Sequence, residues 1–440
     1  MKYDKFFELA KAAGIEEAEL FVGESYSLQF SLFHGEVDNY SSNKSMSILA
    51  RGLVNGKFGT AICDAWSSQR AQYLVNEIVA NAKVIENEDP NFIYEGSKKY
   101  KKVTTFNKEL GNISIDLKMK KLFDLENLIK KGDSRIVEVA AVGYEEEASS
   151  TTIMNSKGLK LTQKGNYFVY YAEAVAKEGE QTKSGFDLFL GNNFEEFKPE
   201  ELAKEAVRKT VSQLGGEACE SKTYKAVLAP SVVKDFLNFY IGNADAEEVQ
   251  KRSSLFIGQL GKKIASKKIT VEDKPLQRNV FSRWFDDEGV ATYNKAIIKN
   301  GVLQTYLYNL TTAAKDGVET TGNASRGGSK MGTSTFFLSL KPGKKSQEEL
   351  FKDVEDGVYI TTVTGLHAGL NPQSGNFSLQ SSGFLIKNGK IDKPLDVITV
   401  SGNLIEVFKD VVEVGSDVKV FPSATSCSSL QIKKIVVSGK

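Results

Sequence analysis

The sequence predicts an α+β protein, in which an N-terminal α/β domain with an antiparallel sheet and flanking helices precedes a C-terminal β-rich domain. Three observations predict this fold class. Apolar and polar side chains alternate in residues 26–62, helical periodicity recurs in the first half, and Asn-Gly turns recur in the second half. The chain has 440 residues, more than the roughly 250–300 that one hydrophobic core supports, so we expect more than one domain.

The first strands are predicted from an alternation of period two. Apolar side chains at positions 26, 28, 30 and 32 alternate with serine and glutamine, which is typical of a strand with one buried face. Residues 46–50 show the same alternation. Asn55-Gly56 then provides the pair that type I′ hairpin turns favour, before a further strand at 58–62. These residues predict consecutive antiparallel strands.

Helices are predicted where apolar residues return every three or four positions. Ser67 can cap the first of them, and a second covers about 116–131, with Gly132 expected at the C′ position just beyond it. A further helix is expected at 199–211, after strands in 135–195. The N-terminal residues Met1–Phe7 carry frequent charges and predict an amphipathic helix rather than a signal peptide. The periodic apolar positions after Ser67 are Ala71, Leu74, Val75, Ile78 and Ala82.

A glycine pair marks the predicted domain boundary. Gly215-Gly216 follows the helix at 199–211 and precedes a polar stretch, so we place one domain at 1–216 and the other at 217–440. Beyond the boundary, Asn300-Gly301 and Asn388-Gly389 predict two further hairpins.

The bulk composition excludes several classes of partner. Lys and Arg number 57 against 56 Asp and Glu, so a net charge of +1 provides no general attraction for nucleic acid or anionic membranes. No apolar run approaches the ~18 residues that a membrane span needs. The three cysteines, Cys63, Cys219 and Cys427, are too few and too widely spaced for a disulfide framework, so we expect a reducing, cytoplasmic location.

Candidate catalytic residues are scarce. The chain contains only two histidines, His34 and His367, whereas a catalytic zinc ion normally takes three protein ligands. No His-Glu-x-x-His string is present, and a Ser-His-Asp triad has few candidates. An unconventional hydrolase that uses His367 or the carboxylates of residues 286–288 remains a weaker alternative.

A glycine-punctuated segment at 364–378 is the best candidate for binding an extended peptide. Small residues let another backbone approach closely, while amide and hydroxyl groups can bond to peptide groups. The alternative is a set of surface turns between strands. The residues proposed to bind substrate are His367, Asn371, Ser374, Gly375 and Asn376.

Six ordered strings in the second half resemble the motifs of the TldD/PmbA family, whose members carry the label modulator of DNA gyrase. The strings are FDDEGV at 285–290, NGVL at 300–303, TGN at 321–323, GLNPQSGNFS at 369–378, ITVSGNL at 398–404 and VGSD at 414–417, with Cys427 after them. Each string is weak alone, but the ordered set is specific.

The resemblance implies a two-subunit zinc metallopeptidase. In this family the TldD-like subunit binds zinc through a His-Glu-x-x-x-His helix and a later cysteine, and the PmbA/TldE-like subunit lacks the histidines. The corresponding helix is expected here near 231–241, where no histidine or glutamate occurs, although Cys427 matches the family cysteine in spacing.

This chain therefore resembles the PmbA/TldE side. We expect no catalytic residue, metal or cofactor in this chain and zinc in a TldD-like partner. We also expect a homo- or heterodimer, and a peptide or unfolded polypeptide substrate that passes residues 366–378. The alternative is a homo-oligomeric peptide-binding or scaffolding protein without peptidase activity.

Overall fold

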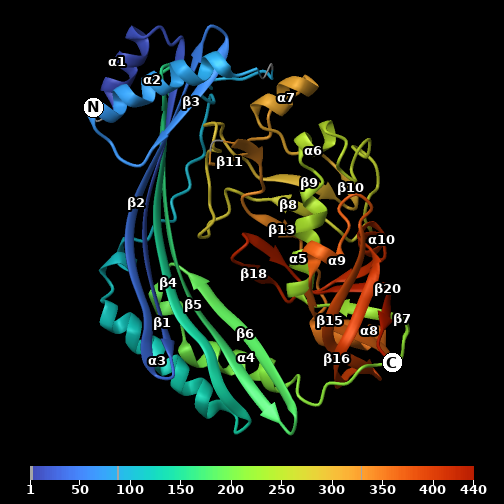
Figure 1. Cartoon of the computed structure of the whole chain (residues 1–440). Helices are drawn as coiled ribbons and strands as arrows, with labels where there is room; N and C mark the ends of the chain where they lie inside the picture. Colours follow the sequence, from blue (N-terminus) through green and yellow to red (C-terminus); the bar gives the residue numbers. More distant parts are fainter. Residues whose placement is uncertain (1–2, 87–88, 329) are drawn as a thin grey trace.

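A computed structural model of the chain describes residues 3–86, 89–328 and 330–440. A long, curved sheet with four helices forms the first part, and the second part, made of shorter strands and helices, packs beside it (Figure 1). The predicted α+β class is confirmed. No helix within the described ranges is long and apolar enough to cross a membrane.

The first sheet has six strands in the order β3-β2-β1-β4-β5-β6, and every neighbouring pair is antiparallel. The predicted hairpin is confirmed, because Asn55 and Gly56 connect β2 to β3 with positive φ angles of 51° and 75°. The strands are β1 Glu17–Phe33, β2 Glu36–Val54, β3 Lys57–Cys63, β4 Ile136–Asn155, β5 Lys160–Glu178 and β6 Gln181–Gly191.

Four helices cover one face of this sheet in two groups. Leu20 and Val22 of β1 pack in a cluster with α1 and α2, while Leu28 and Phe30, further along the same strand, pack with α3 and α4. The predicted cap is confirmed, since Ser67 Oγ accepts a hydrogen bond from the backbone N–H of Arg70 at 3.1 Å. The helices are α1 Asp4–Ala12, α2 Ser68–Val84, α3 Ile115–Gly132 and α4 Pro199–Val211. Met1 and Lys2, included in the predicted N-terminal helix, lie outside the described residues.

The prediction for Gly132 was wrong. Gly132 is the last residue of α3 rather than a left-handed residue beyond it, and Asp133 caps the helix in an extended conformation. A Cβ atom at Gly132 would lie 2.8 Å from Val207 Cγ2. The glycine therefore allows α4 to pack closely against the end of α3.

The second part contains two further six-stranded sheets and a two-stranded ribbon. One sheet has the order β16-β15-β14-β7-β20-β17, with an additional pairing of β16 with β20, and the other has the order β10-β9-β8-β13-β19-β18. The strands of the first are β7 Lys222–Leu228, β14 Gly357–Thr364, β15 Asn376–Lys387, β16 Lys390–Asn403, β17 Val411–Val414 and β20 Leu430–Ser438. Those of the second are β8 Val271–Asp273, β9 Lys295–Lys299, β10 Val302–Leu303, β13 Leu338–Leu340, β18 Lys419–Phe421 and β19 Thr425–Cys427. The ribbon is β11 Ala324–Gly327 with β12 Lys330–Thr333.

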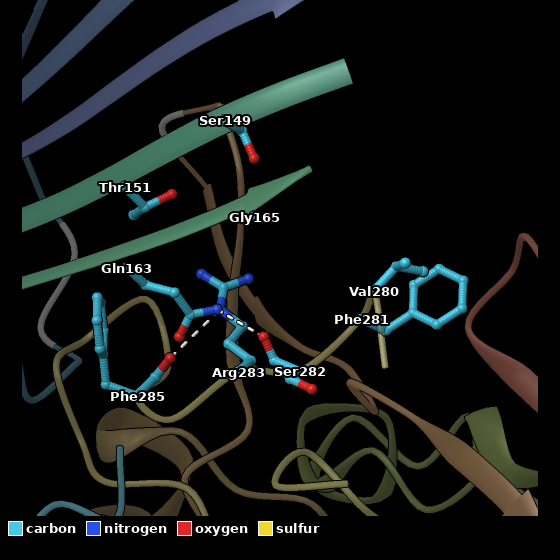
Figure 2. Close-up of a pocket in the computed structure, with 9 residues that line it drawn as sticks. All are labelled: Ser149, Thr151, Gln163, Gly165, Val280, Phe281, Ser282, Arg283 and Phe285. Atoms are coloured by element: carbon cyan, nitrogen blue, oxygen red, sulfur yellow. Dashed lines mark hydrogen bonds between the residues drawn. The ribbon is translucent and has the colours of Figure 1, made fainter. Parts of the chain in front are cut away.

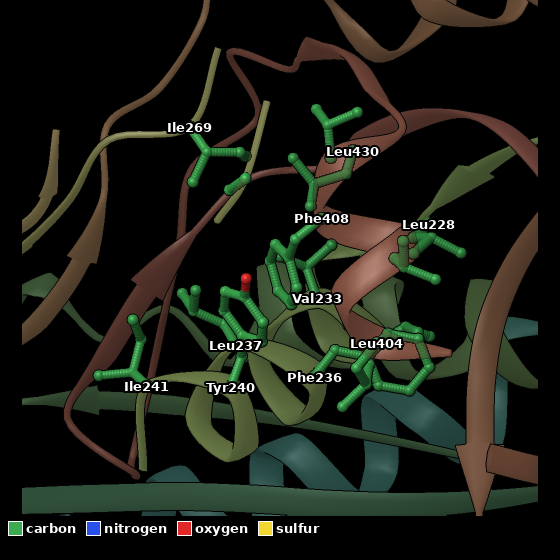
Figure 3. Close-up of a cluster of buried hydrophobic side chains, with 14 of the residues drawn as sticks. Leu228, Val233, Phe236, Leu237, Tyr240, Ile241, Ile269, Leu404, Phe408 and Leu430 are labelled. Carbon is green, nitrogen blue, oxygen red and sulfur yellow. The ribbon is translucent and has the colours of Figure 1, made fainter. Parts of the chain in front are cut away.

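Helix α5, Pro230–Gly242, lies at the centre of the second core. Figure 3 shows Phe236, Leu237 and Tyr240 of α5 pointing into a cluster with Leu404 and Phe408 of α10. The Tyr240 and Phe408 rings stack with centroids 4.2 Å apart. The helix predicted near 231–241 is confirmed, and it packs against β14 and β19. The remaining helices are α6 Ala246–Gln250, α7 Leu310–Asp316, α8 Gln347–Val354, α9 Leu366–Gly369 and α10 Leu404–Lys409.

Candidate functional site

Strand β19 lies along one side of α5, and this contact brings Cys427 to the helix. Cys427 Sγ donates a hydrogen bond to the carbonyl oxygen of Pro230 at 3.3 Å. Two residues earlier on the strand, Thr425 Oγ1 donates to Asn238 Oδ1 at 2.8 Å. Pro230 and Asn238 are eight positions apart and share a helix face with Lys234, which lies midway between them. Lys234 is therefore on the side of α5 that β19 follows.

Lys234 forms an ion pair on this face. Its Nζ atom lies 2.8 Å from Asp235 Oδ1 and 5.5 Å from the centroid of the Phe421 ring on β18. The two charged side chains are 26% and 31% exposed, so solvent still reaches both groups. Because the pair is half-exposed, its contribution to stability is small.

Cys427 is fully buried and favours the neutral thiol. Burial raises the pKa of Cys427, an effect that nearby Lys234 opposes and that Asp417 and Asp235 reinforce. Zinc binds the thiolate form of cysteine, so this environment disfavours a metal ligand. The described residues also contain no group of three or more His, Cys, Asp or Glu side chains that could hold a metal ion. The zinc that the resemblance implies for the related subunit therefore does not fit the residues found here.

The predicted peptide-binding residues form a self-supporting turn. Asn371 Oδ1 accepts hydrogen bonds from the backbone N–H groups of Gln373 and Ser374, at 2.9 and 3.0 Å. Ser374 Oγ accepts one from the N–H of Asn376 at 3.3 Å. The oxygen atoms that were expected to suit a bound peptide are thus used by the turn itself. His367 lies exposed on the short helix α9 just before this turn.

Asn403, at the end of β16, anchors the same turn. Its Nδ2 atom donates to the Ser374 carbonyl at 2.8 Å and to Asn376 Oδ1 at 2.9 Å. Gly375 has a φ of +73°, and a Cβ atom there would lie 3.3 Å from Leu255 Cδ1, so the position requires glycine. Asn371, Ser374, Gly375 and Asn376 therefore lie together in one turn, and His367 precedes this turn on α9 without a contact to it among the described interactions.

This turn and the Cys427 contact lie on different sides of α5. Phe377, which follows the turn, has its ring centroid 5.1 Å from that of Phe236. Phe236 is two positions after Lys234, which places it roughly 200° around the helix. The predicted peptide-binding residues and the Cys427 region therefore do not form one continuous site within the chain.

The carboxylates of residues 286–288 are buried and engaged in structural contacts. Asp286, Asp287 and Glu288 are 0%, 4% and 3% exposed. Asp286 accepts three backbone N–H groups, Asp287 pairs with Arg283, and Glu288 Oε2 accepts the N–H of Leu310 at the start of α7 at 2.8 Å. Burial, reinforced by the neighbouring Glu288, raises the pKa of Asp286 to about 8. A hydrolytic role would need these groups to reach substrate, which their burial prevents.

The same acidic turn lies in a buried charge cluster between the first sheet and the second part. Arg51 Nε donates to Glu19 Oε1 at 2.7 Å across β1 and β2, and Arg326 of β11 lies 3.7 Å from the same oxygen. The Arg326 guanidinium also stacks 5.1 Å from the Phe21 ring centroid. We call Glu19, Arg51, Asp287, Glu288 and Arg326 the interface charge cluster; it connects β1 and β2 to the 286–290 turn.

A small cavity lies where the second part crosses β4 and β5. Its volume is about 160 Å³, and Figure 2 shows Gln163 and Arg283 approaching one another beside it. Gln163 Nε2 donates to the Ser282 carbonyl at 2.7 Å, and Gln163 Oε1 accepts the N–H of Trp284 at 2.9 Å. The cavity is smaller than an ordinary ligand site, so we regard it as part of the contact between the two parts. Its lining is Ser149, Thr151, Gln163, Gly165, Val280, Phe281, Ser282, Arg283 and Phe285.

The sequence did not point to Lys234 and Asp235, because the helix near 231–241 is distinguished in the sequence only by its lack of histidine and glutamate. Nor did the sequence point to Glu19, Arg51 and Arg326, because isolated charges on alternating strands are usually solvated. Period two does not identify Glu19 and Arg51 either, because they pair on the face of the sheet opposite Leu20 and Ala50, which pack with α1 and α2.

Family comparisons cover most of the chain. Residues 18–82 match PmbA/TldA metallopeptidase domain 1, residues 108–214 match the central domain, and residues 221–439 match the C-terminal domain. An uncharacterized protein of Methanocaldococcus jannaschii is 30% identical over 421 residues, covering 94% of both chains. A metalloprotease PmbA homolog of Buchnera aphidicola is 29% identical, covering 72% of this chain and 71% of its own.

Solved structures agree with these matches. A Thermotoga maritima protein described as a candidate modulator of a DNA gyrase superimposes with a TM-score of 0.92 and 32% identity, covering 99% of each chain. TldE from Thermococcus kodakarensis shares the fold with a TM-score of 0.93 and 22% identity over the whole of both chains. The three domain matches, the conserved fold and the identity over nearly the full length show that this chain belongs to the PmbA/TldD metallopeptidase family.

Proposed function

We propose that this chain is the zinc-free partner subunit of a PmbA/TldD-type metallopeptidase, and that it contributes to peptide binding while a TldD-like subunit provides the zinc. The observation that carries the proposal is the position of Cys427. This cysteine lies against α5 as a buried, neutral thiol, and the helix beside it offers Lys234 and Asp235 in place of imidazole ligands. Relatives named PmbA, TldE and TldD exist as separate proteins, which supports a division of roles.

The proposal is tested by combining this chain with a TldD-like chain that carries the His-Glu-x-x-x-His helix. We expect the two to co-purify, and we expect peptide cleavage only when both are present. The isolated, tag-free chain should contain far less than one zinc ion per molecule and should cleave no peptide. About one zinc per isolated chain, or cleavage by this chain alone, would contradict the proposal. A stable homo-oligomer that ignores the TldD-like chain would instead favour the scaffolding alternative.

Replacing Cys427 by serine should leave the activity of the assembled complex within about twofold of the original. The thiol is buried and bonds to the Pro230 carbonyl, an interaction that a serine hydroxyl can reproduce. Peptide cleavage and melting temperature should be measured on the same preparation. A complex that stays folded and assembled but loses most of its activity would show that the thiol takes part in the reaction.

The segment Leu366–Ser378 is expected to border the substrate path of the assembled enzyme. His367→Ala is the cleanest variant, because this side chain is exposed on α9, and we expect it to raise KM for peptides several-fold without changing the melting temperature. Asn371→Ala and Ser374→Ala should also weaken processing, but the Asn371 variant also removes two hydrogen bonds of the turn. The melting temperature of the Asn371 variant therefore has to be compared with that of the unchanged chain before its peptide kinetics are interpreted. Unchanged peptide kinetics in all three variants would show that the segment is only a surface turn with no role in substrate binding.

A further inference from the structure

The exposure of α5 defines where a six-residue metal motif could lie on this helix. Apart from the exposed Gly242 at its end, its residues divide into a fully buried face and one half-exposed arc. The half-exposed residues are Ser231, Lys234, Asp235, Asn238 and Phe239.

Only one placement of a His-Glu-x-x-x-His string fits that arc. The motif needs its first, second and sixth residues on the accessible side, since all three act at the metal or on substrate. Within Pro230–Gly242, only the window that begins at Lys234 meets this condition, because every other window puts at least one of these residues on the buried face. Lys234, Asp235 and Phe239 therefore occupy the positions of histidine, glutamate and histidine.

The surroundings of Lys234 agree with this placement. β19 follows the helix face that contains Lys234, and Cys427 bonds to the helix one turn earlier, at Pro230. Of the charged groups near Cys427, Lys234 has the largest electrostatic effect on the thiol. The ammonium group of Lys234 therefore provides positive charge on the side of α5 that Cys427 contacts.

We infer that Lys234 replaces the metal as a fixed cation, and that its pair with Asp235 closes a latent zinc site between α5 and Cys427. This inference deepens the proposed function, on which it rests, by naming the residues that keep zinc out of this subunit. A divalent cation would have to displace the ammonium group and to deprotonate the buried thiol, and both steps oppose binding. Imidazole groups at positions 234 and 239 would remove the first obstacle and add two ligands of the kind that zinc prefers.

The test restores the motif in the full chain with the triple variant Lys234→His, Asp235→Glu and Phe239→His. Zinc content, measured after removal of loosely bound metal, should rise from near zero to about one ion per chain. With Co²⁺ in place of zinc, the variant should show the absorption bands of a tetrahedral site that includes a thiolate. Adding Cys427→Ser to the triple variant should remove these bands and the tightly bound zinc.

The matched control keeps the lysine. Asp235→Glu with Phe239→His adds a ligand but leaves the ammonium group in place, so it should stay metal-free. If this control binds as much zinc as the triple variant, Lys234 does not exclude metal and the inference is wrong. A folded triple variant that binds no zinc, or one whose zinc survives Cys427→Ser, would overturn the placement of the site.

Phe239 packs partly against the core, so its replacement could prevent folding. The double variant Lys234→His and Asp235→Glu then provides the test, because it should still give the cobalt–thiolate band, and a folded variant without that band would overturn the inference. These measurements use the isolated chain and no peptide. Their outcome therefore does not depend on whether this chain associates with a TldD-like subunit.

Discussion

Replacing Arg51 by methionine is expected to destabilise the protein by about 3–5 kcal/mol, because the change leaves the carboxylate of Glu19 buried without its main partner. The Arg51 and Glu19 side chains are 10% and 1% exposed and bond at 2.7 Å. Methionine can fill the space of the aliphatic stem and keep contact with Phe58, over which the guanidinium now lies. The expected loss therefore comes mainly from the unpaired charge rather than from a cavity.

The measurement is urea-induced unfolding at neutral pH, followed with probes in each part of the chain. Arg70→Met is the matched control, because Arg70 lies 3.9 Å from Asp64 in an exposed pair and should change stability by less than about 1 kcal/mol. A second variant, Arg51→Met with Glu19→Gln, removes both charges and should recover part of the loss. If Arg51→Met is as stable as the control, the buried carboxylate of Glu19 does not depend on Arg51 and the expectation is wrong.

Local patterns were sufficient to predict much of the first sheet and its helices. The strand at residues 26–32 and the helix at 199–211 were both recognisable, because one buried face produces a period of two in a strand and about 3.6 in a helix. Asn55-Gly56 could be located because a type I′ turn demands residues that tolerate positive φ. These signals depend only on residues that are close together along the chain, so a single sequence is enough to detect them.

Interactions between distant segments could not be predicted in the same way. β1 pairs with β4 over residues separated by more than 100 positions, and no local pattern encodes that register. The interface charge cluster likewise joins Glu19 and Arg51 to Glu288 and Arg326, which come together only when both parts have folded. Gly132 shows the same limit, since its role depends on Val207 and not on its own helix.

The candidate site was predictable in part. The resemblance located α5 and Cys427, and the absence of histidine was evident from the sequence. That Lys234 and Asp235 form a pair on the face beside β19 required the structure, because helix exposure depends on packing. The turn around Asn371 shows the converse. Its polar residues suggested ligand contacts, whereas the structure uses their oxygen atoms to satisfy backbone groups in the turn.

Asp286 is expected to make the stability of the protein fall as pH rises between about 4 and 8. Burial and the charge of Glu288 raise the pKa of Asp286 to about 8 in the folded chain, from an ordinary value of 3.8, and they outweigh three backbone N–H groups that favour the carboxylate. The pKa of Glu288 is raised as well, chiefly by burial, while Arg51 opposes that shift. Lys295 and Tyr100 also interact electrostatically with Asp286.

The direction of this pH dependence follows from the proton on Asp286 that the folded chain retains. Below pH 4 both folded and unfolded chains hold the proton of Asp286, so the stability associated with it is fully present. Between about pH 4 and 8 only the folded chain holds it, and the free energy of unfolding should fall by about 1.4 kcal/mol per pH unit from this group alone. Above pH 8 the folded chain has released this proton too, so the stability associated with it is fully lost. Urea unfolding measured from pH 5 to 9 should show this slope. Asp286→Asn should reduce the slope by about 1.4 kcal/mol per pH unit. The amide also weakens the contact with the Ala324 N–H, so the variant should be less stable at every pH. Equal slopes in the two proteins would show that Asp286 is ionised throughout, held by its backbone donors against the cost of burial.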